Sequence, residues 1–209
     1  MKTCVIFCAA EFDKPAQPIG QEDLVIAADG GLKHTEKLDI APDVVLGDFD
    51  SLGYVPDSAA VFPVEKDDTD SMLAVKLGLE RGFKRFVVYG GMDGERLDHT
   101  VANFQMLQYL ADRSAEAYLV GRQYIATALR NGCVAFDSRA EGIVSVFCMG
   151  ADALGVNIEG LKYTLTDGTL SSGYPLGVSN HFVGQKARIS VKEGCLLILW
   201  DRNNGFPER

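Results

Sequence analysis

The first half of the chain alternates short strand-like runs with helix-like segments, and this alternation restricts the fold more than any other feature of the sequence. The runs have the length and the β-branched and aromatic composition of strands, and they lie at 5–7, 24–26, 44–46, 61–62 and 86–89. The helix-like segments lie at 32–38, 71–81 and 100–110. Strands that alternate with helices predict βαβ units in a mostly parallel sheet, with 117–120 as the expected last strand.

The pattern changes beyond about Gly121. Strand-like runs at 134–136, 143–148, 187–191 and 196–200 are separated by turns such as Asp167-Gly168 and 192–194, without an amphipathic helix of useful length. This pattern predicts an antiparallel sandwich or barrel-like domain. We therefore expect an α/β domain over 1–123 and a β-rich domain over 124–209, packed together because no Pro/Ser-rich linker separates them.

Composition argues against several partners. Lys+Arg 20 against Asp+Glu 29 gives a net charge of −9 without a basic stripe, which disfavours nucleic acid and anionic membranes as partners. No apolar stretch approaches the ~20 residues of a membrane helix, and the run after Lys2 is better explained as a strand than as a secretory signal. Five scattered cysteines without a C-x-x-C pair indicate reduced thiols, and hence a cytoplasmic protein.

Four acidic and glycine-rich clusters stand where strand-like runs end. They are D-G-G from Asp29, G-D-F-D-S from Gly47, K-D-D-T-D from Lys66 and G-G-M-D-G-E-R-L-D-H from Gly90. Open α/β sheets bind ligands outside the carboxyl ends of their strands, so the four clusters can meet at one site. Their carboxylates would repel one another, and a divalent metal is the usual reason for such a grouping. Through metal ions an acidic chain can still bind a polyphosphate.

The aspartates of the second and third clusters are candidate metal ligands. Asp48 and Asp50 are two residues apart, so in extended backbone both face one ion, although a polar turn with local hydrogen bonds is the alternative. Asp67, Asp68 and Asp70 stand just before a predicted helix, where one aspartate would suffice as a cap. We therefore expect at least Asp70 to face a shared magnesium ion, which prefers a few carboxylates together with water and phosphate oxygens.

The fourth cluster predicts contacts with phosphate. Gly90, Gly91 and Gly94 permit tight turns and a close approach of backbone N–H groups to phosphate at a helix start. The planar guanidinium of Arg96 suits phosphate oxygens, and Asp98 follows two residues later. The structural alternative is that Asp98 caps the helix and Arg96 is its surface partner.

Other enzyme classes are disfavoured. The chain contains neither G-x-x-x-x-G-K nor a complete G-x-G-x-x-G, which argues against P-loop and dinucleotide-binding enzymes. His99 is better explained as a capping or buried structural residue than as a general base.

In this order and at these separations the clusters resemble the thiamine pyrophosphokinase (thiamin diphosphokinase) family. A-D-G-G at Ala28, G-D-F-D-S, K-D-D-T-D and G-x-x-x-G-E-R-L-D-H-T-x-A-N from Gly90 look like the family's catalytic half. G-L-K-Y-T-L from Gly160 and G-V-S-N from Gly177 resemble its thiamine-binding domain. The resemblance covers nearly the whole chain, and it departs at His181 and over 121–148.

The resemblance implies an ATP-dependent pyrophosphoryl transferase that converts thiamine into thiamine diphosphate and releases AMP. It implies a homodimer whose site joins the α/β domain of one subunit to the β domain of the other. Catalytic roles are expected for Asp48, Asp50, Asp70, Arg96 and Asp98, the first three as ligands of Mg²⁺. Nucleotide contacts are expected from Asp29, Gly30, Gly31, Asp67, Gly90 and Gly91.

Thiamine contacts are expected from Ser179 and Asn180. Tyr163 and Tyr174 are candidate aromatic neighbours of the thiamine rings, although packing within the sandwich is the simpler role for both. A pyrophosphokinase of another alcohol, such as a hydroxymethyl pterin, would use the same scaffold, but the S-N turn favours thiamine. A non-catalytic sensor of nucleotide or thiamine diphosphate is disfavoured because every acidic cluster is present.

Overall fold

The chain forms two compact units in a computed structural model that describes residues 1–47, 49, 60–61 and 68–209. The first, here the α/β unit, contains Met1–Met106 and Ala115–Arg122. The second, here the β unit, contains Leu107–Ser114 and Gln123–Arg209. The predicted fold classes are confirmed, since the first unit has a parallel sheet with helices and the second has antiparallel sheets. None of the described helices combines the length and apolar character needed to cross a membrane.

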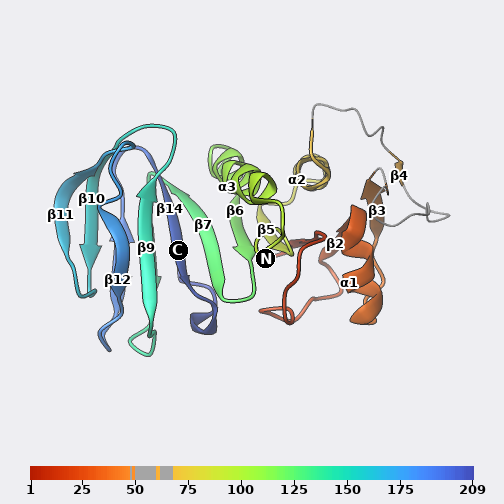
Figure 1. The fold of residues 1–209 in the computed structure, drawn as a ribbon, viewed down its shortest axis with the longest axis horizontal. Coiled ribbons are helices and arrows are strands. Elements are labelled where there is room, and N and C mark those ends of the chain that lie inside the picture. The colour runs from red at the N-terminus through yellow and green to blue at the C-terminus, as the bar shows by residue number, and fades with distance from the viewer. Residues whose placement is uncertain (48, 50–59, 62–67) are drawn as a thin grey trace. The chain divides into compact units, whose positions relative to one another are not determined.

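A parallel sheet forms the centre of the α/β unit (Figure 1). Its strands are β1 (Cys4–Phe7), β2 (Leu24–Ala28), β3 (Val44–Gly47), β4 (Ala60–Val61), β5 (Arg85–Tyr89) and β6 (Glu116–Val120). Their order is β6-β5-β1-β2-β3-β4. Nearly every residue of β1, β2, β5 and β6 is buried, which explains why these strands are continuous apolar runs in the sequence.

Three helices and one short 3₁₀ turn accompany this sheet. The turn η1 (Asp29–Gly31) leads into α1 (Leu32–Lys37), and α2 (Asp70–Glu80) and α3 (Leu97–Ala111) follow along the chain. Right-handed connections place α1 on one side of the sheet and α2 and α3 on the other (Figure 1). Because β1 pairs with β2 on one side and β5 on the other, the strand order reverses there. Ligands of open α/β sheets bind at such a switch point.

Two antiparallel sheets form the β unit. One has the order β12-β9-β14-β7 and the other the order β11-β10-β13-β8. The strands are β7 (Tyr124–Arg130), β8 (Cys133–Phe136), β9 (Ile143–Cys148), β10 (Ala153–Glu159), β11 (Leu165–Leu170), β12 (Gly177–His181), β13 (Ala187–Ser190) and β14 (Cys195–Asp201), and η2 (Arg202–Asn204) follows.

Aromatic side chains join the two sheets of the β unit. The ring of Phe136 on β8 meets Trp200 on β14 edge to face with centroids 5.3 Å apart, and it meets Phe182 at 5.1 Å. The Trp200 indole N–H donates to the carbonyl oxygen of Gly205 at 2.8 Å, so the polar atom of this fully buried side chain has a partner. The β unit therefore has its own apolar core.

Two expected turns lie inside strands instead. Asp167-Gly168 belongs to β11, and Ser179-Asn180 belongs to β12, and the pairing register shifts beside each pair. Asp167 has φ +46° and Ser179 has φ +58°. Small polar residues that tolerate positive φ occur in turns and also where an extra residue interrupts a strand ladder, so the sequence pattern did not separate the two.

Candidate active site

A pocket of about 770 Å³ lies in the α/β unit at the carboxyl ends of β1, β2 and β5. Its wall contains residues 8–10 after β1, Ala28 and Asp29 at the end of β2, and 69–71 at the start of α2. The remaining wall consists of residues between 90 and 103, in the loop after β5 and the first turns of α3. The pocket thus surrounds the switch point at β1.

Predicted site residues fall into three groups. Those that line the pocket are Asp29, Asp70, Gly90, Gly91 and Arg96. Those that lie outside the residues described by the structure are Asp48, Asp50 and Asp67. The α/β-unit residues that are placed but do not belong to the pocket wall are Gly30, Gly31 and Asp98.

Two glycines of the predicted site allow close packing of backbone. Gly31 is buried in η1, where a Cβ atom would lie 1.9 Å from the carbonyl oxygen of Phe7. Gly90 has φ +67°, and a Cβ there would lie 2.5 Å from the carbonyl oxygens of both Cys8 and Ala10. The chain therefore requires glycine at both positions, at Gly31 to seat η1 on β1 and at Gly90 to bring the loop after β5 against the loop after β1.

Two carboxylates make the floor of the pocket electronegative. Burial, together with the negative charges of Asp70 and Asp29, raises the pKa of the Cys8 thiol to about 12. The Cys8 thiol is therefore protonated at neutral pH and is a poor nucleophile. Asp29, directly after β2, and Asp70, at the start of α2, therefore both place negative charge near the Cys8 thiol.

Asp68, by contrast, forms an ion pair with Lys76. The Lys76 ammonium lies 2.6 Å from the Asp68 carboxylate, and Asp68 does not belong to the pocket wall. Asp70, two residues later, begins α2 and lines the pocket. Thr69 caps that helix, since its hydroxyl accepts a hydrogen bond from the Met72 N–H at 3.3 Å. The cap is thus separate from the aspartate that faces the pocket.

Arg96 and Asp98 form an exposed pair at the edge of the pocket. The guanidinium donates two hydrogen bonds to the carboxylate, at 3.2 Å and 2.5 Å, and the side chains are 70% and 64% exposed. The hydrogen bond from Arg96, aided by the His99 N–H, lowers the pKa of Asp98. Arg96 lines the pocket, and Asp98 holds its guanidinium through two of the guanidinium nitrogens, as the structural alternative of a surface pair expected. A planar guanidinium can also bind phosphate oxygens.

The carboxylates of the pocket fit a magnesium ion. Mg²⁺ is bound in proteins by one or two carboxylates together with water and substrate phosphate oxygens, and Asp29 and Asp70 supply two carboxylates. Within the described residues no three His, Cys, Asp or Glu side chains gather closely enough to hold a metal ion by themselves. The donor set therefore suits a cation that arrives with a phosphate ligand.

Several wall residues were not predicted from the sequence. They are 8–10, Thr69, Ser71, Glu95, His99, Thr100 and Asn103. Segment 8–10 follows a strand directly, as the acidic clusters do, and that position alone could have identified it. His99 was expected to be a capping or buried structural residue, and because it is exposed on the pocket wall the buried role is wrong.

In the β unit, the predicted thiamine residues lie on β12. Ser179 is exposed, whereas Asn180 is only 4% exposed and its amide is engaged internally. Asn180 Oδ1 accepts from the Tyr163 N–H at 2.9 Å, and Asn180 Nδ2 donates to the Tyr163 carbonyl oxygen at 2.6 Å. A second bond to Oδ1 comes from the His181 N–H. Asn180 thus joins the G-V-S-N and G-L-K-Y-T-L motifs through backbone atoms.

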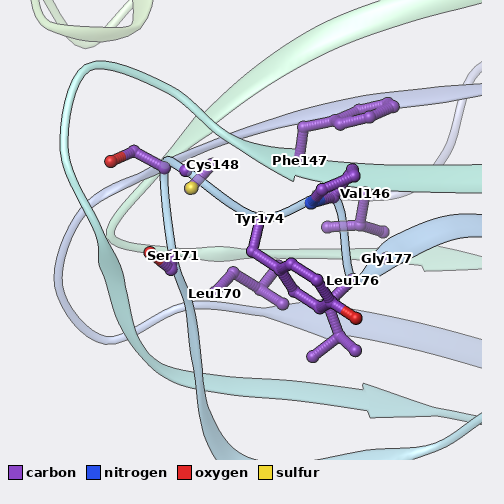
Figure 2. Close-up of a pocket in the computed structure, with 11 residues that line it drawn as sticks. Val146, Phe147, Cys148, Leu170, Ser171, Tyr174, Leu176 and Gly177 are labelled. Carbon is purple, nitrogen blue, oxygen red and sulfur yellow. The ribbon is translucent and has the colours of Figure 1, made fainter.

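A smaller pocket of about 180 Å³ lies beside the start of β12 (Figure 2). It is lined by the end of β9 and by residues 170–177, among them Tyr174 and Leu176. Tyr174 is 67% exposed and Tyr163 is 60% exposed, so neither tyrosine is a packed residue of the sandwich interior. Both remain available as aromatic surfaces of the β unit.

Comparison with known proteins assigns a family to each part of the chain. Residues 16–119 match the model of the thiamin pyrophosphokinase catalytic domain, and 134–196 match that of the thiamin pyrophosphokinase vitamin B1 binding domain. The chain is 25% identical to the thiamine pyrophosphokinase of Bacillus subtilis (strain 168) over 188 residues, which cover 86% of this chain and 87% of that protein.

Solved structures are similar over almost the full length. A crystal structure of thiamine pyrophosphokinase from Bacillus subtilis has a TM-score of 0.81 at 24% identity, covering 96% of this chain and 99% of that one. A thiamin pyrophosphokinase from Geobacillus thermodenitrificans has a TM-score of 0.76 at 25% identity, covering 96% and 97%.

Proposed function

The chain belongs to the thiamin pyrophosphokinase family, with its catalytic domain followed by its vitamin B1 binding domain, and from this premise we propose which residues carry the reaction. The enzyme transfers the pyrophosphoryl group of ATP to the hydroxyl of thiamine, and the products are thiamine diphosphate and AMP. The pocket at the switch point of the α/β unit is the proposed site for the ATP triphosphate. The observation that carries this proposal is the meeting of Asp29, Asp70, Gly90, Gly91 and Arg96 in one pocket.

Acidic residues and backbone groups have different proposed roles in this pocket, metal binding for the first and phosphate binding for the second. Asp70, with Asp48 and Asp50, would hold Mg²⁺, and Asp29 and Asp67 would contribute to nucleotide binding. When bound, Mg²⁺ neutralises charge on the triphosphate and stabilises the charge that develops during transfer. Gly90 and Gly91 would let the backbone approach the phosphates, and Gly30 and Gly31, in the turn that follows β2, would contribute to nucleotide binding. Arg96, which Asp98 holds through two hydrogen bonds, would bind the phosphate oxygens.

Transfer requires the thiamine hydroxyl to attack the β-phosphorus in line with the departing AMP. Positioning and electrostatic stabilisation supply most of the catalysis in such reactions, so the protein needs no covalent intermediate. The protonated Cys8 thiol agrees with this, because it offers no nucleophile at the pocket floor. The acidic and guanidinium side chains are the functional groups that the reaction uses.

The β unit holds thiamine in this proposal. Exposed Ser179 on β12 contacts the substrate, and Asn180 supports that surface by holding Tyr163. The aromatic rings of Tyr163 and Tyr174 are exposed and can stack on a heterocycle. The proposals that the enzyme is a cytoplasmic homodimer, with each site completed by the partner's β domain, rest on the family resemblance.

Product analysis tests the proposed function. Purified protein is incubated with ATP, Mg²⁺ and thiamine, and nucleotides and thiamine phosphates are separated by chromatography. We expect AMP and thiamine diphosphate in equal amounts, no reaction after Mg²⁺ is removed with EDTA, and no product with a hydroxymethyl pterin in place of thiamine. Formation of ADP with thiamine monophosphate, or turnover of the pterin alone, would contradict the proposal.

A further inference from the structure

A series of hydrogen bonds joins residues of the wall of the switch-point pocket. The hydroxyls of Thr69 and Ser71 are 3.0 Å apart, and Ser71 Oγ donates to Asn103 Oδ1 at 2.8 Å. Asn103 Nδ2 donates to the carbonyl oxygen of Gly91 at 2.8 Å. Ser71 is 8% exposed and Asn103 is 6% exposed, so water does not replace these bonds readily. This series of hydrogen bonds links the start of α2, the body of α3 and the loop after β5.

The direction of every bond in this series is determined. Gly91 presents a carbonyl oxygen, so the Asn103 amide must turn its NH₂ group toward Gly91 and its oxygen toward Ser71. The single Ser71 hydroxyl proton therefore goes to Asn103, and Thr69 donates to Ser71. A flipped amide would set two carbonyl oxygens against each other at Gly91. Asn103 is consequently locked in one orientation.

The two ends of this hydrogen-bond series lie in parts of the pocket to which we assign different roles, namely metal binding and phosphate binding. Asp70 stands between Thr69 and Ser71, and Gly91 belongs to the phosphate-facing loop. Gly91 is also pressed against Asn103, since a Cβ at Gly91 would lie 3.2 Å from Asn103 Nδ2. A shift of Asn103 would therefore change the position of the carboxylate relative to the glycine loop.

We propose that Asn103 is a positioning residue that sets the distance between the Asp70 carboxylate and the Gly90–Gly91 backbone, and that Ser71 transmits this constraint. The inference rests on the proposed function, because it gives those two groups the tasks of holding metal and phosphate. Asn103 acts through its neighbours and does not react with substrate. The side chains that surround a catalytic group in this way commonly change activity about 10–100-fold when they are removed.

The test compares Ser71→Ala, Asn103→Ala and the double variant, with Asn157→Ala as the control. The Asn157 amide also bonds two backbone groups, since its oxygen accepts from the Asp167 N–H at 2.9 Å and its NH₂ group donates to the Gly155 carbonyl oxygen at 3.3 Å. Asn157 lies on β10 of the β unit. Steady-state kinetics are measured with ATP, Mg²⁺ and thiamine varied in turn, and thermal unfolding is recorded for each variant. The wild type is assayed first, since a wild type that makes no thiamine diphosphate defeats the proposed function and not the positioning role.

For Asn103→Ala we expect kcat/KM for ATP to fall about 10–100-fold and the Mg²⁺ requirement to rise, with the KM for thiamine within about 2-fold of wild type. Ser71→Ala is expected to have a smaller effect of the same kind. The double variant should lose little more than Asn103→Ala, because both residues act through one series of hydrogen bonds. Asn157→Ala should keep wild-type kinetics.

Three results would overturn the inference. The first is an equal change in kcat/KM for ATP and in kcat/KM for thiamine. The second is a loss of kcat/KM in the double variant that equals the sum of the two single losses in free energy. The third is a lowered unfolding temperature with unchanged kinetics. If Asn103→Ala does not fold, Ser71→Ala decides the question, because alanine keeps the helix start of α2 intact. An unchanged ATP and Mg²⁺ dependence in Ser71→Ala would then count against the proposal.

Discussion

Asn180 shows how one buried side chain can join two distant segments of the chain through their backbone atoms. Its amide oxygen and nitrogen bond both backbone groups of Tyr163, which stands 17 residues earlier in the chain. Asn204 makes the same pair of bonds to Glu141, at 3.0 Å and 2.9 Å, in another part of the β unit. The two asparagines therefore share this pair of bonds, although Asn180 is buried and also accepts from the His181 N–H, whereas Asn204 is partly exposed.

This pair gives a prediction at the scale of the residue. Asn180→Ala should raise the KM for thiamine about 10-fold and leave the KM for ATP unchanged, because it releases Tyr163 and the strand that carries Ser179. It should also lower the free energy of unfolding by about 1–3 kcal/mol, since buried backbone groups lose their partners. Asn204→Ala should leave both KM values unchanged. Equal increases in the two KM values for Asn180→Ala would mean that its role is general stability.

Sequence reasoning located the acidic residues better than the amides that support them. Asp29 and Asp70 follow from a local rule, because each stands beside the end of a strand or the start of a helix. The bonds of Asn103 reach residues 12 and 32 positions away. Such bonds depend on how α2, α3 and the loop after β5 pack together, which no local pattern encodes.

At the scale of the element, the sequence predicted the strands of the parallel sheet but missed four strands of the β unit, which are β7, β10, β11 and β12. The buried strands of the parallel sheet are continuous apolar runs and were predicted within a few residues. In contrast, β11 with the sequence LTDGTL and β12 with GVSNH have few β-branched or aromatic residues, and neither was predicted as a strand. Their strand conformation comes from pairing with β10 and β9, and context of this kind outweighs propensity.

The loop after β5 supplies the prediction at this scale, through two glycines that both have positive φ. Gly90→Ala would place a methyl group 2.5 Å from two backbone carbonyl oxygens, whereas Gly82→Ala, at φ +83°, has open space around it. Backbone strain alone costs about 1–3 kcal/mol, so Gly82→Ala should fall within that range and keep full activity. Gly90→Ala should cost more and should lose ATP-dependent activity, as measured by urea unfolding and by kcat/KM for ATP. Equal losses of stability and activity in the two variants would show that the positive φ of Gly90, and not its close contacts, explains the effect.

At the scale of the whole molecule, the candidate nucleotide site and the candidate thiamine residues belong to different units. Asp70 lies in the α/β unit and Asn180 in the β unit. In a homodimer whose sites are completed by the partner's β domain, closed two-fold symmetry makes two equivalent sites from two chains. Lesions carried by different chains can then fall in the same site.

Subunit exchange tests this arrangement. Asp70→Asn and Asn180→Ala proteins are mixed at a thiamine concentration below the KM of Asn180→Ala, and exchange is verified by native mass spectrometry. Random exchange should restore about one quarter of wild-type activity, because half of the dimers carry both lesions in one site and an intact second site. Verified exchange without recovery would show that each site is built within a single chain.

The central claim is that the pocket at the switch point of the α/β unit is where pyrophosphoryl transfer occurs, and two neighbouring aspartates test it most directly. Asp70 lines the pocket, whereas Asp68 pairs with Lys76 and does not. With kcat measured over a range of Mg²⁺ concentrations, Asp70→Asn should lower kcat at least about 100-fold and raise the Mg²⁺ requirement, since a bound metal contributes several kcal/mol to catalysis. Asp68→Asn should remain within about 3-fold of wild type, because a partly exposed ion pair contributes about 0–1 kcal/mol. Near-normal turnover by Asp70→Asn at limiting Mg²⁺, or an equal loss in both variants, would contradict the assignment of this pocket.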